Sequence, residues 1–143
     1  MKIFLDTGVL GQLVHVNEAM KESVVDWAIT MLERGEELIV PEIADYELRR
    51  ALLKIDSVQS LKDLDQWNKT VTYLPIRTTH MHKAAELWAQ CRKENRPFAK
   101  DAALDGDVIL IAQTLEYAGA VIATTNVGHL SQLADARQWS DIN

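Results

Sequence analysis

MKIFLDTGVL, residues 1–10, sets the first expectation for the fold. Residues 2–5 are typical of a short buried β-strand, because they are strand-compatible and Gly8 gives a turn signal soon afterwards. Asp6 then lies where this strand ends. In open α/β sheets ligands bind beyond the carboxyl ends of the strands, so Asp6 is a candidate site residue. A simple cap of the turn by Asp6 or Thr7 is the alternative, which this stretch leaves open.

Length and composition limit the possible classes of protein. The chain has 143 residues, which predicts a single domain over residues 1–143 that can bury a core without extra stabilisation by disulfides or metals. Its one cysteine, Cys91, excludes an internal disulfide framework. We find no basic segment followed by an apolar signal region, and no apolar run near the roughly 18 residues of a membrane helix. We therefore expect a soluble, cytoplasmic protein without a membrane segment.

The charge balance bears on possible partners. The 21 acidic and 15 basic side chains give a formal net charge of -6. A protein that coats nucleic acid needs a strongly basic surface, so this balance argues against that role. It leaves room for a local basic patch or for a basic protein partner.

Helix-like and strand-like patterns alternate along the chain. Short apolar runs predict four strands, and apolar residues at helical spacing predict five helices. The predicted strands are residues 2–5, 38–40, 71–74 and 120–123, and the predicted helices are residues 21–34, 42–55, 58–68, 80–95 and 105–119. Alternation of this kind indicates a parallel sheet covered on both faces. We therefore expect a three-layer α/β/α fold with a mainly parallel sheet of four to five strands.

Acidic side chains on two of these helices are further candidates. Glu47 lies about 60° around its helix from the apolar Ala44, so it should sit at the rim of the core, where it could point into the crevice. An ion pair with Arg50 or Lys54 is the alternative.

Asp105 and Asp107 lie at the expected start of the helix over residues 105–119. The helix dipole favours acids there, and one of them could be the N-cap. We assign capping to Asp105 and chemistry to Asp107.

Polar residues follow the last predicted strand as well. In VIATTNVGHL, residues 121–130, Thr124, Thr125 and Asn126 come directly after the strand, as Asp6 does after the first one. We expect these groups to converge on one crevice. His129 is the only histidine that falls near it.

The order of these segments resembles a known family. FLDTGVL, PEIADYELRRAL, DGDVILIAQTLEYAG and VIATTNVGHL together are similar to the PIN-domain ribonucleases, many of which are VapC-type toxins of bacterial toxin-antitoxin pairs. The resemblance implies that Asp6, Glu47 and Asp107 occupy the family's acidic positions. Its fourth position is commonly Asp or Asn after the strand threonine, which fits Asn126. An amide there leaves open whether a fourth ligand exists, although it can orient a water or a substrate phosphate.

The chemistry of such a site agrees with the resemblance. Two carboxylates about 4 Å apart repel one another by about 4 kcal/mol at an effective dielectric constant near 20, and a divalent cation removes this cost. Mg²⁺ and Mn²⁺ prefer hard oxygen ligands, lower the pKa of a bound water and stabilise charge on a phosphate. We therefore expect metal-dependent hydrolysis of RNA with Asp6, Glu47 and Asp107 as ligands. Supporting roles are expected for Thr7, Asp105, Thr124 and Thr125, and Asn126 is expected to position water.

Expected partners follow from charge and from the resemblance. Arg50, Lys54, Lys100 and His129 are candidate RNA contacts. A basic antitoxin could insert an arginine among the acids and mimic the charge of the metal. The resemblance also implies a homodimer of about twice the 16.1 kDa chain mass, held by apolar helix faces left over from the core.

Other classes of protein fit the sequence less well. A haloacid-dehalogenase-like phosphatase needs a second aspartate two positions after the first, where this chain has Gly8. A phospho-accepting receiver domain needs an early cluster of acids, which KIFLDTG lacks. A catalytically weakened PIN-like module that binds a partner stays open as the alternative, and Asn126 favours it.

Overall fold

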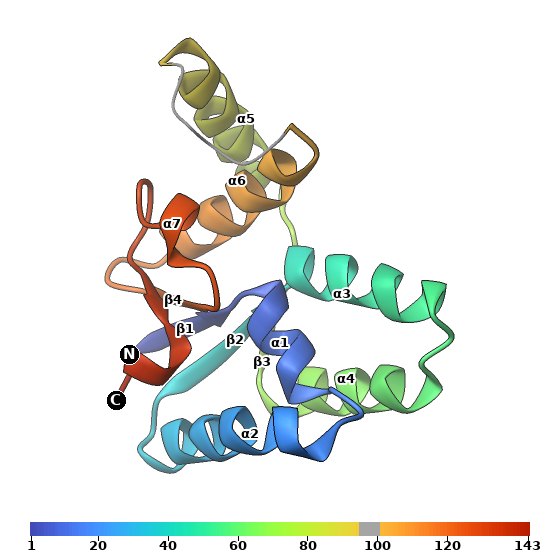
Figure 1. Cartoon of the computed structure of the whole chain (residues 1–143). Helices are drawn as coiled ribbons and strands as arrows, with labels where there is room; N and C mark the ends of the chain where they lie inside the picture. Colours follow the sequence, from blue (N-terminus) through green and yellow to red (C-terminus); the bar gives the residue numbers. More distant parts are fainter. Residues whose placement is uncertain (95–100) are drawn as a thin grey trace.

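The computed structural model describes residues 1–94 and 101–143, with the side chains of residues 101–103 left out, as an α/β fold (Figure 1). Its sheet has the order β3-β2-β1-β4-β5, and every neighbouring pair is parallel. The strands are β1 (Lys2–Leu5), β2 (Glu37–Pro41), β3 (Thr72–Leu74), β4 (Val121–Thr124) and β5 (Ala136–Gln138). The helices are α1 (Thr7–Leu13), α2 (Glu18–Glu33), α3 (Glu42–Lys54), α4 (Val58–Thr70), α5 (Thr78–Lys93), α6 (Asp101–Leu115) and α7 (Val127–Leu130), followed by the 3₁₀ turn η1 (Trp139–Asp141).

The strand order puts a switch point beside β1, at the place where open α/β sheets form a ligand crevice. This central strand pairs with β2 on one side and with β4 on the other, with Ile3 opposite both Leu38 and Val121. Figure 1 shows α2 and α4 on one side of the sheet and α6 and α7 on the other. The chain leaves β1 towards β2, and it reaches β4 only after α5 and α6 on the opposite face. The strand order therefore reverses between β1 and β4, which is where open α/β sheets bind ligands.

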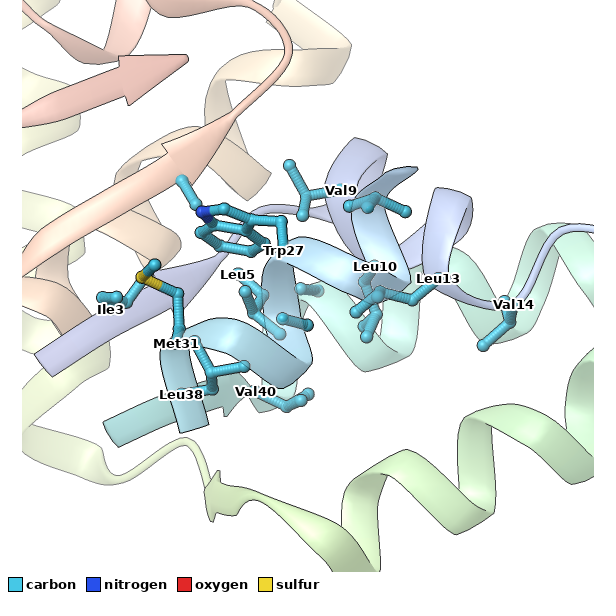
Figure 2. Packing of buried hydrophobic residues seen from close by; sticks show 14 of the residues in the cluster. Ile3, Leu5, Val9, Leu10, Leu13, Val14, Trp27, Met31, Leu38 and Val40 are labelled. Atoms are coloured by element: carbon cyan, nitrogen blue, oxygen red, sulfur yellow. The ribbon is translucent and has the colours of Figure 1, made fainter. Parts of the chain in front are cut away.

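Alternating side chains of the strands build one core on each face of the sheet. Ile3 and Leu5 of β1 pack against Trp27 and Met31 of α2, as Figure 2 shows. Phe4 points to the other face, where the buried residues of α6 cover it. Burial on both faces explains why β1 is a continuous apolar run. The sheet is thus the middle layer of three, as predicted.

The predicted elements are largely confirmed, with three additions. The range of β1 is as predicted, and the other predicted strands differ by one residue at one or both ends. The additions are α1, α7 and β5, which are short and lack a clear apolar period. In the helices of the described residues, none has both the length and the apolarity of a membrane span.

Some of the apolar residues whose helical spacing predicts these helices are exposed. Ile55 follows the last residue of α3 and is 70% exposed, while Met81 and Trp88 of α5 are 46% and 41% exposed. Met81 and Trp88 line an open groove of about 410 Å³ with Val108 and Ile109 of α6. The helical spacing of α5 is confirmed, but its apolar stripe is wider than the surface that α6 covers.

Polar contacts fix the start of α3, the helix that carries Glu47. The Glu42 carboxylate accepts hydrogen bonds from the backbone N–H of Ile76 (2.9 Å) and from the Tyr73 hydroxyl (3.3 Å). Gln113 of α6 is fully buried and donates to the Leu74 carbonyl at 2.9 Å. These contacts tie α3 and α6 to the end of β3. The two helices that carry candidate acids are therefore held against the same edge of the sheet.

Candidate metal centre

Asp6 lies at the end of β1 and begins the next helix. Its backbone N–H donates to the Ala123 carbonyl at 3.0 Å, which continues the pairing of β1 with β4. One carboxylate oxygen, Oδ1, accepts from the Thr7 N–H at 2.7 Å, so Asp6 is the N-cap of α1. The other, Oδ2, accepts from the Thr124 hydroxyl at 2.7 Å. Capping thus uses one oxygen, and the second joins β1 to β4 across the crevice.

Burial of Asp6 disfavours its charged form. It raises the pKa of the carboxyl group, and the hydrogen bonds from Thr124 and Thr7 only partly oppose this rise. A carboxyl group whose pKa is raised by burial is typical of functional sites.

Thr7 links Glu47 to Asp6. Its hydroxyl donates to Glu47 Oε1 at 2.8 Å, while its backbone N–H holds Asp6. The ion pair with Arg50 that the sequence left open is long, with 4.0 Å between Arg50 Nη2 and Glu47 Oε2, and Arg50 is exposed. Thr7 is therefore the close partner of Glu47, and Arg50 lies at the outer limit of an ion pair.

Asp107 lies on α6, where the charges of Asp6 and Glu47 act on it. Its pKa is raised to about 6, first by burial and then by repulsion from Asp6 and Glu47, and His129 opposes the rise. The structure thus places Asp107 near enough to Asp6, Glu47 and His129 for their charges to act on it.

The predicted capping role of Asp105 is wrong. The α6 helix begins at Asp101, so Asp105 lies inside it and cannot be the N-cap. Asp105 is exposed and lines the groove with Met81 and Trp88, on another face of α6 from Asp107. The physical reason is that α6 begins four residues earlier than predicted, so the two acids that fit a first helical turn lie inside the helix.

Thr124 organises the segment that follows β4. Its side chain is fully buried, and its hydroxyl oxygen accepts the Asn126 N–H at 3.0 Å while donating to Asp6. Asn126 directly precedes α7 and is exposed. Thr125 is also exposed, and its hydroxyl lies against Gly8 of α1.

Two glycines that the sequence analysis did not assign to the site permit close approach between its elements. A Cβ added to Gly8 would lie 2.8 Å from the Thr125 hydroxyl oxygen. A Cβ added to Gly106 would overlap the Glu47 carboxylate, with 3.0 Å to its Cδ. Glycine in a helix interior costs about 1 kcal/mol relative to alanine, so the glycine within DGDVIL was the available signal.

The candidate RNA contacts differ in how the structure places them. Arg50 and Lys54 are exposed on α3, the helix of Glu47. His129 lies in the last turn of α7, near Asp107. Lys100 lies outside the described residues.

The donor chemistry of this site fits a hard divalent cation, although the side chains are not closed around one. Mg²⁺ and Mn²⁺ prefer oxygen ligands such as carboxylates. Three carboxylates here are near enough to affect one another's charge, and threonine hydroxyls orient two of them. In the described part of the chain, no three His, Cys, Asp or Glu side chains stand close enough to share one ion. The three carboxylates are thus spread apart, and a bound cation would offset the repulsion that, after burial, raises the pKa of Asp107. Carboxylates rotate readily once their charge is balanced, so this donor set suits the ion despite the spread.

The raised pKa of Asp107 predicts how the metal-free protein responds to pH. Because the carboxyl titrates at about 6 when folded and at 3.8 ordinarily, the folded state binds more protons between these values. Stability therefore falls as pH rises through this window, and Asp6, whose pKa is also raised, acts in the same direction. We expect the loss of melting temperature in chelator between about pH 4 and pH 6.5 to be larger for the wild type than for Asp107→Asn.

A matched control for this measurement is Asp26→Asn, which removes an exposed carboxylate on α2. That variant should keep the pH response of the wild type. Equal responses of the wild type and Asp107→Asn would show that Asp107 does not titrate in this window.

Solved structures with a similar fold belong to bacterial complexes. VapBC2 from Rickettsia felis, bound to a DNA fragment from its promoter, matches with a TM-score of 0.73 and 14% identity over 96% of this chain and 98% of that chain. VapBC-1 from nontypeable Haemophilus influenzae matches with a TM-score of 0.72 and 18% identity over 98% and 99%. FitAcB from Neisseria gonorrhoeae matches with a TM-score of 0.72 and 19% identity over 98% and 99%. At these identities the likeness shows the fold alone.

The sequence itself identifies the family. A search of curated proteins gives no match. The family model of the PIN domain matches residues 3–135, which is nearly the whole chain. The chain therefore belongs to the PIN domain family.

Proposed function

We propose that this protein is a Mg²⁺- or Mn²⁺-dependent endoribonuclease of the cytoplasm and the toxin component of a toxin-antitoxin pair. One observation carries the proposal. The carboxylates of Asp6 at the end of β1 and of Glu47 on α3 lie near enough to Asp107 on α6 for their charges to raise its pKa. Membership of the PIN domain family and the fold shared with VapBC chains support it.

Asp6, Glu47 and Asp107 would hold the cation in this proposal. When bound, the ion supplies positive charge that stabilises the scissile phosphate and acidifies a water. Thr124 and Thr7 fix the orientation of the Asp6 and Glu47 carboxylates through their hydrogen bonds. The exposed Asn126 amide orients the attacking water or a phosphate oxygen at the rim, and His129 contacts the RNA backbone beside Asp107.

Cleavage of RNA with and without metal tests this function. We expect purified protein to cut single-stranded or structured RNA with Mg²⁺ or Mn²⁺, to stop when chelator is added, and to resume when metal is restored. Gel analysis of end-labelled RNA would measure this. Protein that binds Mn²⁺ but leaves RNA intact would instead favour the weakened module that binds a partner, for which Asn126 is the specific observation.

An antitoxin is the protein partner that fits this proposal. The net charge of -6 and the mutual repulsion of these acids suit a basic segment that inserts an arginine among Asp6, Glu47 and Asp107. The VapBC and FitAcB structures support such an assembly. A neighbouring reading frame that encodes a small basic protein whose product inhibits cleavage would support it, and a purified product that does not bind would contradict it.

We also propose a homodimer. Met81 and Trp88, exposed on α5, leave an apolar surface beside α6 that supports a helix-mediated contact. Light scattering at about twice the 16.1 kDa chain mass would agree with this assembly, and a monomer would contradict it.

A further inference from the structure

We propose that Gly106 is a positioning residue for the metal site, because the absence of a side chain there lets the Glu47 carboxylate lie directly against α6. This inference deepens the proposed function and rests on it. Its evidence is a contact between α3 and α6 that needs glycine at one position of α6.

The close approach involves the whole carboxylate of Glu47. A Cβ at position 106 would overlap Oε2 and would lie 3.0 Å from Cδ and 3.3 Å from Oε1. Gly106 is buried, and it directly precedes Asp107 in the chain. A methyl group here would therefore displace the Glu47 carboxylate at the place where it acts on Asp107.

The displacement would change the site more than the fold. Glu47 Oε1 is held by the Thr7 hydroxyl at 2.8 Å, and Oε2 has the exposed Arg50 as its other neighbour, at 4.0 Å. A carboxylate pushed off Gly106 would give up the hydrogen bond from Thr7 and swing outward towards Arg50 and solvent. The end of a glutamate side chain moves at little cost, whereas the α6 backbone is held by its own hydrogen bonds.

This mechanism separates stability from metal binding. Alanine is a better helix former than glycine, which offsets the lost hydrogen bond from Thr7, so Gly106→Ala should melt at about the same temperature as the wild type in chelator. The same variant should bind Mn²⁺ about 10-fold or more weakly, which is the usual effect of losing the groups that orient a ligand. Titration calorimetry with Mn²⁺ alone measures the affinity, and thermal unfolding in chelator measures the stability.

Gly11→Ala is the matched control. Gly11 also lies within a helix, α1, but a Cβ there would meet only Leu48 Cδ1, at an ordinary 3.5 Å. This variant should keep the wild-type affinity for Mn²⁺. Asp6→Asn is the second control, and it should lose Mn²⁺ binding.

A double-mutant cycle with Glu47→Gln shows whether Gly106 acts through Glu47. The glutamine keeps the size of the side chain but not its charge, so adding Gly106→Ala to it should weaken Mn²⁺ binding by less than about 2-fold, against about 10-fold in the wild type. Equal losses in both backgrounds would contradict an action through Glu47.

Other outcomes decide the inference separately from the proposed function. Wild-type affinity for Mn²⁺ in Gly106→Ala, with binding lost in Asp6→Asn, would overturn the role of Gly106 and leave the metal site in place. A large drop in the melting temperature of metal-free Gly106→Ala would also overturn it, because α6 rather than Glu47 would then yield to the methyl group. Undiminished binding by Asp6→Asn would refute the metal site itself.

Discussion

Asp6→Asn should lower metal-dependent RNA cleavage by about 100-fold or more, since loss of groups that only orient a ligand already costs about 10- to 100-fold. The substitution removes a negative charge at the crevice between β1 and β4 and keeps the size of the side chain. Cleavage rates with Mn²⁺ at saturating RNA would measure the effect.

The same variant should fold as well as the wild type. An asparagine at this position can still cap α1 by accepting the Thr7 N–H, and the Thr124 hydroxyl has the Asn126 carbonyl at 3.4 Å as another acceptor. Burial raises the pKa of Asp6, so a neutral side chain relieves a cost in the metal-free protein. We therefore expect a melting temperature in chelator equal to that of the wild type or higher.

Asp26→Asn provides the control for this prediction, since it removes an exposed carboxylate from α2. It should cleave RNA at the wild-type rate. Robust cleavage by Asp6→Asn would refute Asp6 as a ligand, whereas loss of activity together with a large drop in melting temperature would point to a role in folding.

The part of the site at the sheet edge could be predicted because it depends on strand ends. An apolar run that stops at Asp6 and another that stops at Thr124 indicate two parallel strands, whose carboxyl ends meet at one edge. The 2.7 Å hydrogen bond between these two side chains agrees with that expectation. The strand pattern alone therefore predicts that Asp6 and Thr124, which are far apart in the chain, lie side by side.

The parts that escaped prediction depend on tertiary contacts. TGVLGQL contains Gly8 and Gly11 and suggests a turn, yet it forms α1 because Asp6 caps it and its apolar residues pack under α2. The sequence pattern starts α6 too late, because Asp105 and Asp107 resemble the acids of a first helical turn. The closeness of Gly106 to Glu47 arises only when α3 and α6 are packed together, and neither local sequence records that contact.

Asp45 shows a similar limit for charged residues. Nothing in the sequence pattern singles it out, but it is buried on α3 and accepts hydrogen bonds from Arg49, Asn68 and Tyr73. Its partners come from α3 itself, α4 and β3. These hydrogen bonds hold α3 against α4 and β3, which explains why a carboxylate is buried there. The burial of Asp45 therefore gives no evidence for catalysis.

Reversing the charge of Arg50 and Lys54 together should weaken RNA cleavage strongly and leave Mn²⁺ binding intact. With a net charge of -6, the protein repels RNA as a whole, so a local group of cations must hold the backbone near the acids. Arg50 and Lys54 are exposed on the helix of Glu47. Removing one cation that binds a phosphate should reduce the salt dependence of binding to single-stranded RNA by about 0.7 in logarithmic slope, so the double variant should show a reduction of about 1.4.

The double variant Arg34→Glu/Lys69→Glu makes the same change in net charge, but near the amino ends of the strands. Arg34 and Lys69 are both exposed and lie shortly before β2 and β3 begin, whereas Asp6 follows the end of β1. If Arg50 and Lys54 bind RNA, the Arg50→Glu/Lys54→Glu variant should raise KM and lower the salt slope far more than this control. Equal effects of the two variants would show that overall charge governs binding, and unchanged cleavage by the first would place the RNA contacts elsewhere. Because Arg50 lies 4.0 Å from Glu47, its reversal adds negative charge beside the site, so retained or tighter Mn²⁺ binding distinguishes loss of RNA from loss of metal.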